Sequence, residues 1–363
     1  MVDDSDLLTS RLECETSFEG LLACLAEREP GAVWTASAVI ADRRITVECD
    51  DRLFFAEFFS MFGGVEPQNG RLATSSDMHL DIRAGVHPAF GWFRMSGSSE
   101  LPVDAREFSF AIETQLGNFQ LLPLHEPAWR CIAFRGSNVP ALAFHGSDCI
   151  FSLDPRWRLC IVWYLFWRLL RMRFDAIFFH ASAMGMFGEG TIFVGPGRAG
   201  KSTTALALAA RGHNFLSDEV AGYVPACGDL IPFRRPVGIK PGPRADAVTR
   251  GLAPEVAKQI ERDGFVRIDV NSLFPVAPPS PLLLRRVVFL RGFAERPRLE
   301  RIRPGRSEIV ELQPLMSSFL NAPHSRRVFE LTRLLSSAKV YQLHLGEPDV
   351  TAAYLEEMFG CEK

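Results

Sequence analysis

Lysine is scarce in this sequence. Of its 363 residues 40 are basic, but only five of these are lysine, and none occurs before Lys201. Arginine fills nearly every other basic position, so a retained lysine suggests a need for a compact point charge on a flexible stem. Lys258 and Lys363 stand where ordinary surface residues are expected. The scarcity therefore draws attention to Lys201 without assigning it a role.

The sequence also lacks a stretch long enough to cross a membrane. Its most apolar run covers residues 159–167 and is bracketed by Arg158 and Arg168. A bilayer span needs about 20 apolar residues, so we expect a buried helix and no membrane span. The flanking arginines leave a membrane-associated helix open as the alternative.

Metal-binding and export signals are absent as well. The eight cysteines form no CxxC pair and show no other metal-ligand spacing. The first six residues are acidic and begin no apolar run, so no signal peptide is expected. Free thiols in a cytoplasmic protein are the plain interpretation. No internal repeat or low-complexity segment is visible.

The composition is that of a globular protein with an uneven distribution of charge. Hydrophobic residues make up 47% and charged residues 23%, and the length suggests two domains or one large one. Residues 1–150 hold 22 acidic and 11 basic side chains, a net charge of −11, whereas residues 151–363 hold 21 and 29, a net charge of +8. We interpret this change as a boundary between domains 1–150 and 151–363. Either the two halves dock against each other, or the acidic half binds a basic partner.

A glycine-rich motif lies near the middle of the chain. Residues 195–202 (GPGRAGKS) match G-x-x-x-x-G-K-[ST], between an expected strand at 191–194 and an expected helix that stops at Gly212. Such a junction gathers backbone N–H groups and the positive end of a helix dipole around one point. It predicts a nucleotide site in which Lys201 reaches the outer phosphates and Ser202 contacts Mg²⁺; the binding residues are Gly195, Gly197, Arg198, Ala199, Gly200, Lys201, Ser202 and Thr203. An ordinary glycine-rich turn is the alternative.

An acidic pair follows the next expected strand. Asp218 and Glu219 come directly after residues 214–217. A carboxylate in this place can hold Mg²⁺ directly or through water, or it can accept the proton of an attacking hydroxyl. The sequence leaves both roles open, together with an acidic surface loop.

Three further polar residues are candidates. His180 lies on an expected strand, 176–184, which a short turn joins to the strand before the motif, so the two strands are expected to be antiparallel and His180 to lie near the loop. A packed core histidine is the alternative. Arg235 and Lys240 follow a hairpin and could stabilise the negative charge of a transferring phosphoryl group. A solvated basic turn would explain them equally.

The remaining pattern predicts a small α+β module before residue 150 and a mixed α/β domain after it. The expected helices are 7–29, 53–62, 154–173, 244–263, 314–320, 326–335 and 350–359. Two strands are expected within 33–47, and a meander from residue 79 to about 122 includes strands at 108–113 and 119–122. Further expected strands are 130–134, 141–144, 220–224, 230–233 and 340–345, with 282–290 pairing to 299–302.

The segment from His180 to Lys240 resembles the catalytic domain of HPr kinase/phosphorylase and its relatives. The order and spacing of the His180 strand, the glycine-rich motif, residues 211–213 (RGH), 216–219 (LSDE) and 235–240 carry the resemblance. It implies a fold similar to the phosphoenolpyruvate-carboxykinase-like P-loop kinases, with a smaller amino-terminal α+β domain. It also implies ATP-dependent phosphorylation of a serine hydroxyl, with Asp218 matching the family's proton-accepting aspartate and His180 its histidine close to the phosphates.

The sequence departs from that family in three respects. Glu219 stands where the family commonly has aspartate, and we find no counterpart of the phosphorylase-associated stretch. The amino-terminal half also differs, so the closer resemblance is to HPr-kinase-related proteins. Some of these are similar to kinases that act on peptides in natural-product pathways.

These observations favour one function and leave two alternatives. The first is a kinase that uses ATP and Mg²⁺ to phosphorylate a hydroxyl of a peptide, protein or small molecule. The second is a nucleotide sensor of the same fold without catalysis. An ATPase coupled to motion ranks last, because no arginine finger or oligomerisation motif is evident. We expect no nucleic-acid partner, and a homo-oligomer is left open.

Overall fold

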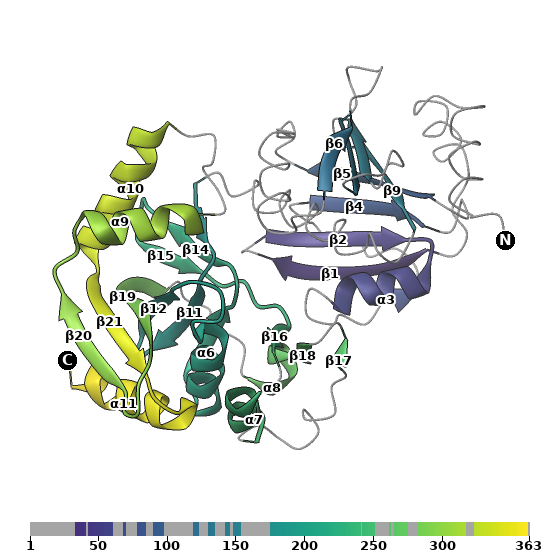
Figure 1. The fold of residues 1–363 in the computed structure, drawn as a ribbon. Helices are drawn as coiled ribbons and strands as arrows, with labels where there is room; N and C mark the ends of the chain where they lie inside the picture. The colour runs from purple at the N-terminus through teal and green to yellow at the C-terminus, as the bar shows by residue number, and fades with distance from the viewer. Residues whose placement is uncertain are drawn as a thin grey trace. The chain divides into compact units, whose positions relative to one another are not determined.

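The computed structural model divides the chain into two compact units, with the main division between Met172 and Arg173. Each unit is considered by itself (Figure 1). The residues that the structure describes are 33–40, 43–60, 68–69, 78–84, 90–97, 119–122, 130–134, 142–145, 148–153, 175–240, 242–250, 261–262, 265–274, 282–316 and 323–361. The predicted boundary at residue 150 falls inside a strand of the first unit, and the division into domains 1–150 and 151–363 stays a prediction.

The first unit is built on a nine-stranded sheet in the order β3-β1-β2-β4-β5-β9-β8-β7-β6. β2 and β4 are parallel, and the other pairs whose register is given are antiparallel. Its elements are β1 (Trp34–Ile40), β2 (Arg43–Cys49), α3 (Arg52–Ser60), β3 (Gln68–Asn69), β4 (Met78–Arg83), β5 (Phe90–Gly97), β6 (Phe119–Leu122), β7 (Arg130–Phe134), β8 (Leu142–His145) and β9 (Asp148–Ser152).

Helix α3 begins where the sequence supplies a cap. The Asp51 carboxylate accepts the backbone N–H groups of Leu53 and Phe54 at 2.8 and 2.9 Å, which satisfies donors that a helix start leaves unpaired. Phe55 is fully buried, and the Phe54 ring stacks on Phe151 of β9 at 5.3 Å. The cap and these rings hold α3 against the sheet.

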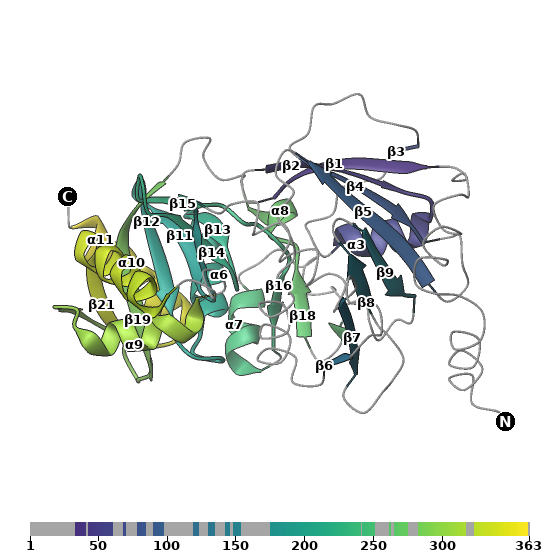
Figure 2. The ribbon, with the colours of Figure 1, turned by 90° about the horizontal axis from the view of Figure 1, so that it is seen from above.

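The second unit contains the sheet that positions the candidate site. β12 (Glu189–Val194), β19 (Leu282–Phe293) and β21 (Lys339–Leu345) are parallel neighbours, with β19 in the middle. On the other side of β12, β11 (Ser182–Met186) is antiparallel both to β12 and to β13 (Asn214–Ser217) (Figure 2). β20 (Arg298–Ile302) pairs with the outer side of β21, and the start of β19 continues through β15 (Asp229–Ile231) and β14 (Ala221–Val224) to β10 (Ile177–Phe179).

Helices cover both faces of this sheet (Figure 1). Side chains alternate along each strand, so Phe193 packs with α6 (Lys201–Ala210), α7 (Pro243–Arg250) and α11 (Pro348–Gly360), whereas Ile192 packs with α9 (Arg306–Leu312) and α10 (His324–Ser337). β12 and β19 are therefore buried on both sides, as expected for parallel strands. A small sheet, β16 (Val237–Ile239), β18 (Phe265–Ile268) and β17 (Glu261–Arg262), and the short helices α8 (Val270–Leu273) and η3 (Gln313–Leu315) complete the unit.

Much of the predicted secondary structure is confirmed. The strand before the glycine-rich motif is β12, the helix after it is α6, and the predicted hairpin at 220–233 is formed by β14 and β15. The mixed α/β class is likewise confirmed. Strands β2, β6, β7, β8 and β21 and helices α3, α10 and α11 also lie where the pattern places them.

Three predictions need correction. The strand expected at 176–184 is broken at His180 and Ala181 into β10 and β11, which pair with different strands; the His180 N–H donates instead to Leu315 O at 2.6 Å. β20 does not pair with β19, because β21 lies between them. Of the helix expected at 244–263, the part up to Arg250 belongs to α7, whereas Glu261–Arg262 near its expected end is strand β17.

Other predictions fall outside the described residues. They are the helices at 7–29 and 154–173, the strand at 108–113, and most of the helix at 314–320, of which the part up to Leu315 forms η3. Of the helices that the structure does describe, none combines the length and apolar character needed to span a bilayer.

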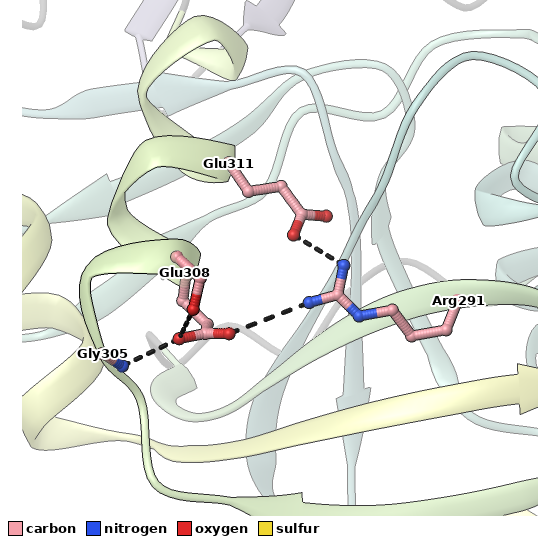
Figure 3. A network of polar contacts seen from close by, with 5 residues as sticks. Arg291, Gly305, Glu308 and Glu311 are labelled. Carbon is pink, nitrogen blue, oxygen red and sulfur yellow. Dashed lines mark hydrogen bonds and ion pairs between the residues drawn. The ribbon is translucent and has the colours of Figure 1, made fainter.

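A buried carboxylate holds the start of α9 to β19. The Glu308 carboxylate accepts the N–H of Gly305 at 2.8 Å and the Ser307 hydroxyl at 2.9 Å, and the Arg291 guanidinium lies 3.9 Å away while bonding Glu311 at 2.6 Å (Figure 3). Burial alone would raise the pKa of Glu308, but these hydrogen bonds and the Arg291 charge together lower it. The ionised form is therefore the one that the fold stabilises.

Replacing this carboxylate by an amide should destabilise the second unit. We expect Glu308→Gln to lower the free energy of unfolding by about 1–3 kcal/mol, because it removes a charge-assisted cap from a buried position. The loss should shrink as the pH falls below the ordinary carboxyl range, where the native Glu308 also becomes protonated. Urea denaturation at several pH values measures this. The matched change Glu311→Gln removes a more exposed ion pair and should cost less than about 1 kcal/mol; equal losses would contradict the assignment.

Candidate functional site

The glycine-rich motif forms the connection between β12 and α6. β12 ends at Val194, residues 195–200 make the loop, and α6 begins at Lys201. Pro196, Gly197 and Arg198 are exposed, whereas Ala199 is buried beside Gly195. Ser202 and Thr203 occupy the first turn of α6 and are half-buried. The loop thus presents an open surface above the amino-terminal end of a ten-residue helix.

Lys201 is buried at the base of this loop. Its side chain is 7% exposed, and its ammonium donates to the carbonyl oxygens of Gly195 at 2.8 Å and Pro196 at 3.1 Å. Burial lowers the pKa of Lys201, an effect that the nearby Asp218 and Glu219 oppose. The carbonyls hold the positive charge inside the turn, directly beneath its exposed residues.

Asp218 reaches the same place from the neighbouring strands. β11 and β13 are antiparallel with Ala183 opposite Ser217, so the residue before Ala183 lies beside the residue after Ser217. Accordingly the Ser182 hydroxyl donates to the Asp218 carboxylate, which is 2% exposed and whose pKa the Ser202 side chain of α6 also influences. Ser182 was not predicted from the sequence; its place two residues after His180 on the expected strand was the available signal.

The pKa of Asp218 is raised. Burial is the main cause and the negative charge of Glu219 the second, while the hydrogen bonds from Ser182 and Ser202 act in the opposite direction. A carboxylate of this kind is a better proton acceptor near neutral pH than an exposed aspartate. The arrangement can therefore hold a proton at a defined atom beside the loop.

His180 joins the group from the break between β10 and β11. It is half-buried and forms a hydrogen bond with the backbone of Glu219. Burial and the charge of Lys201 lower the pKa of His180, so its imidazole is neutral at pH 7. His180 reaches this position because the chain leaves the regular strand pairing between β10 and β11.

Glu219 turns away from Asp218 toward a cation. Its backbone has φ 61°, a left-handed conformation that non-glycine residues rarely adopt, and Arg198 in the loop has φ 67°. The Arg235 guanidinium lies 3.5 Å from the Glu219 carboxylate. Of the three described non-glycine residues with positive φ, two are thus at this site, where strained backbone often accompanies function.

The oxygen atoms of the site suit Mg²⁺ when a nucleotide supplies the other ligands. Ser202 and Glu219 both lie near enough to Asp218 to act on its pKa; Mg²⁺ prefers such hard oxygen donors and completes its shell with phosphate and water. No cluster of three or more His, Cys, Asp or Glu side chains able to hold a metal occurs in the described ranges. Lys240 is exposed directly after β16, and its substrate role stays a prediction.

Comparison with known proteins finds similarity among solved structures alone, and the one described below is distant. No family model matches the chain, and no curated protein matches it. Among solved structures, the chain is similar to the Hpr(Ser) kinase/phosphatase from Coxiella burnetii, with 15% sequence identity over 51% of this chain and 88% of the other, at a TM-score of 0.24. This is a distant relationship in fold, and we draw nothing about the site from it.

Gly200 is the glycine that the loop geometry requires. Its φ is 97°, and an added Cβ would lie 2.6 Å from Leu345 Cδ1, whereas a Cβ on Gly197 would meet nothing within 4 Å. We expect Gly200→Ala to lower the free energy of unfolding by about 1–2 kcal/mol and Gly197→Ala to change it by less than about 0.5 kcal/mol. Chemical denaturation of the two variants tests this. If both changes had a similar effect, a side chain at Gly200 would not cause the strain that we expect.

Proposed function

We propose that this chain is a kinase that uses ATP and Mg²⁺ to transfer a phosphoryl group to a hydroxyl, in the first instance serine, of a peptide, protein or small molecule. The observation that carries the proposal is the position of Asp218, which is 2% exposed and which the Ser182 hydroxyl holds in place. This buried carboxylate with a raised pKa lies close enough to the buried Lys201 for the two charges to interact. A phosphate-binding turn alone would explain Lys201 but not this carboxylate.

The loop and α6 would bind the phosphates. Backbone N–H groups of the loop, from Gly197 onward, and the positive end of the helix dipole favour an anion above Gly197. The buried Lys201 ammonium would exchange its carbonyl partners for phosphate oxygens and follow the charge as it develops. Ser202, Asp218 and Glu219 would hold Mg²⁺, which when bound neutralises charge on the phosphates.

Asp218 would act on the acceptor. Phosphoryl transfer to an alcohol requires that the hydroxyl lose its proton as the bond to phosphorus forms. Ser182 fixes the Asp218 carboxylate by a hydrogen bond, and the neutral His180 and the Arg235–Glu219 pair line the same edge. Asp218 would accept the proton, while Arg235 and Lys240 would stabilise charge on the transferring group.

A nucleotide sensor without catalysis remains the second candidate. The observation that favours it is the ion pair of Arg235 with Glu219, which engages a cation that a kinase could use on the phosphoryl group. Such a sensor would bind ATP through the same loop but modify no acceptor. Binding and transfer therefore have to be measured separately.

Replacing the Asp218 carboxylate by an amide should distinguish the kinase from the nucleotide sensor. We expect Asp218→Asn to reduce phosphoryl transfer by at least about 100-fold, because an amide cannot take the proton, while binding of ATP in the absence of Mg²⁺, through the loop and Lys201, persists. The free energy of unfolding at pH 7 should not fall by much, since burial disfavours the charge that is removed. Labelled ATP incubated with cell lysate, followed by identification of the labelled acceptors, measures transfer, and calorimetry measures binding.

Glu357→Gln is the matched control for this change. Glu357 is an exposed carboxylate near the end of α11, where the neighbouring Glu356 contacts Arg211 at the carboxyl end of α6, away from the loop. Its amide variant should transfer phosphate like the native chain. Undiminished transfer by Asp218→Asn would remove Asp218 from the mechanism, and ATP binding without any labelled acceptor in the native chain would favour the sensor.

The pH dependence of phosphoryl transfer should reflect the raised pKa of the buried Asp218 carboxylate. The active form of Asp218 is ionised, so the rate should fall as the pH decreases through its pKa. Because burial and Glu219 raise that pKa, the midpoint of the fall should lie above 3.8, the ordinary value for aspartate. A pH–rate profile at saturating ATP measures the midpoint. A rate that stays constant down to pH 4 would contradict proton acceptance by Asp218.

A further inference from the structure

An exposed aromatic ring lies beside the glycine-rich loop, on the side away from Asp218. Phe293, the last residue of β19, is 50% exposed. A Cβ placed on Gly200 would lie 3.5 Å from Phe293 Cε1, so the ring borders the loop immediately before Lys201. The other two exposed phenylalanines of the described residues lie elsewhere: Phe187 packs on His213, and Phe329 is on α10.

An irregularity in the backbone sets the position of this ring at the carboxyl end of β19. The register between β19 and β21 shifts after Leu290, and Gly292 adopts φ 105°, so that Phe293 pairs with Leu345. The next N–H, that of Ala294, donates to Leu345 O at 2.7 Å. An irregularity that turns a large apolar side chain toward solvent commonly serves to aim it.

An arginine is fixed over the same ring. The Arg244 guanidinium carbon lies 3.7 Å from the centroid of Phe293, and its Nη1 donates to Gly346 O at 2.9 Å. Arg244 comes from α7 and Gly346 follows β21, so contacts with two elements fix the guanidinium over the aromatic ring. We call Phe293 and Arg244 together the aromatic platform.

The order of the strands places the aromatic platform and Asp218 on opposite sides of the loop. β12, which carries the loop, lies between β11 and β13 on one side and β19 and β21 on the other (Figure 2). Asp218 follows β13, and Phe293 ends β19. If the terminal phosphate of a nucleotide faces Asp218, its nucleoside end extends toward β19.

The geometry points to the aromatic platform as the nucleobase site of the nucleotide whose phosphates lie on residues 195–202. This inference rests on the proposed function. The base stacks on the Phe293–Arg244 pair, since planar π systems favour both an aromatic ring and a guanidinium plane. Stacking of this kind accepts any base, so the platform provides affinity for a nucleoside triphosphate without strong selection between adenine and guanine.

Calorimetric titrations of the full chain with two probes test the platform. The probes are MgATP, which has a base, and magnesium tripolyphosphate, which has the phosphates alone. We expect Phe293→Ala to weaken ATP binding about tenfold or more, by analogy with the loss of one base-stacking side chain, and to change tripolyphosphate binding by less than about twofold. Phe293→Tyr keeps the ring and should bind ATP like the native chain.

Phe329→Ala is the matched control, because it removes an exposed phenylalanine from α10, on the opposite face of the sheet from α6. It should leave both probes unchanged, and thermal unfolding without ligand verifies that each variant is folded. ATP binding that survives Phe293→Ala overturns the platform, as does an equal loss of ATP and tripolyphosphate. If the native chain binds neither probe, the phosphate site itself is wrong and the proposed function fails with it.

Discussion

The burial of two opposite charges at one edge of a sheet is the constraint on which this site depends. Lys201 and Asp218 are both almost fully removed from solvent, and an ionised group in that position costs several kcal/mol unless hydrogen bonds compensate. Two loop carbonyls compensate the lysine, and the Ser182 hydroxyl compensates the aspartate. Because burying such a pair lowers the stability of the fold, we expect these charges to have a function, and the binding and transfer of phosphate would be one.

The antiparallel strand β11 connects the two charges. It lies between β12, which leads into the loop, and β13, which leads into Asp218, and its own first residue is Ser182. The break before β11 turns His180 back toward Glu219, and the hydrogen bond from His180 N–H to η3 anchors that break. One short strand thus sets the spacing between the lysine, the aspartate and the histidine.

The two sides of the loop differ in chemistry. On the side of β11 and β13 the groups are titratable, and the pKa values of His180 and Asp218 are displaced in opposite directions from their usual range. On the side of β19 the surface is an aromatic ring under a guanidinium. A ligand with a charged reactive end and a flat apolar end suits this polarity, which agrees with the proposed nucleotide. The buried Glu308 cap, which Arg291 of β19 joins, ties that side of the sheet to α9.

The sequence by itself determined the local elements of the site. The glycine-rich pattern and the helix formers after it specify a strand, a turn and a helix, because hydrogen bonding within such elements depends on neighbouring residues. It also singled out Lys201, Ser202, Asp218 and His180 as candidates. Only the tertiary structure decided that Ser182 bonds Asp218, that β21 separates β20 from β19, and that Phe293 and Arg244 meet beside Gly200. These contacts join residues that are far apart in the sequence, up to 93 positions for Phe293 and Gly200. They depend on the order and register of the strands, which the periodicity of residues along the chain does not specify.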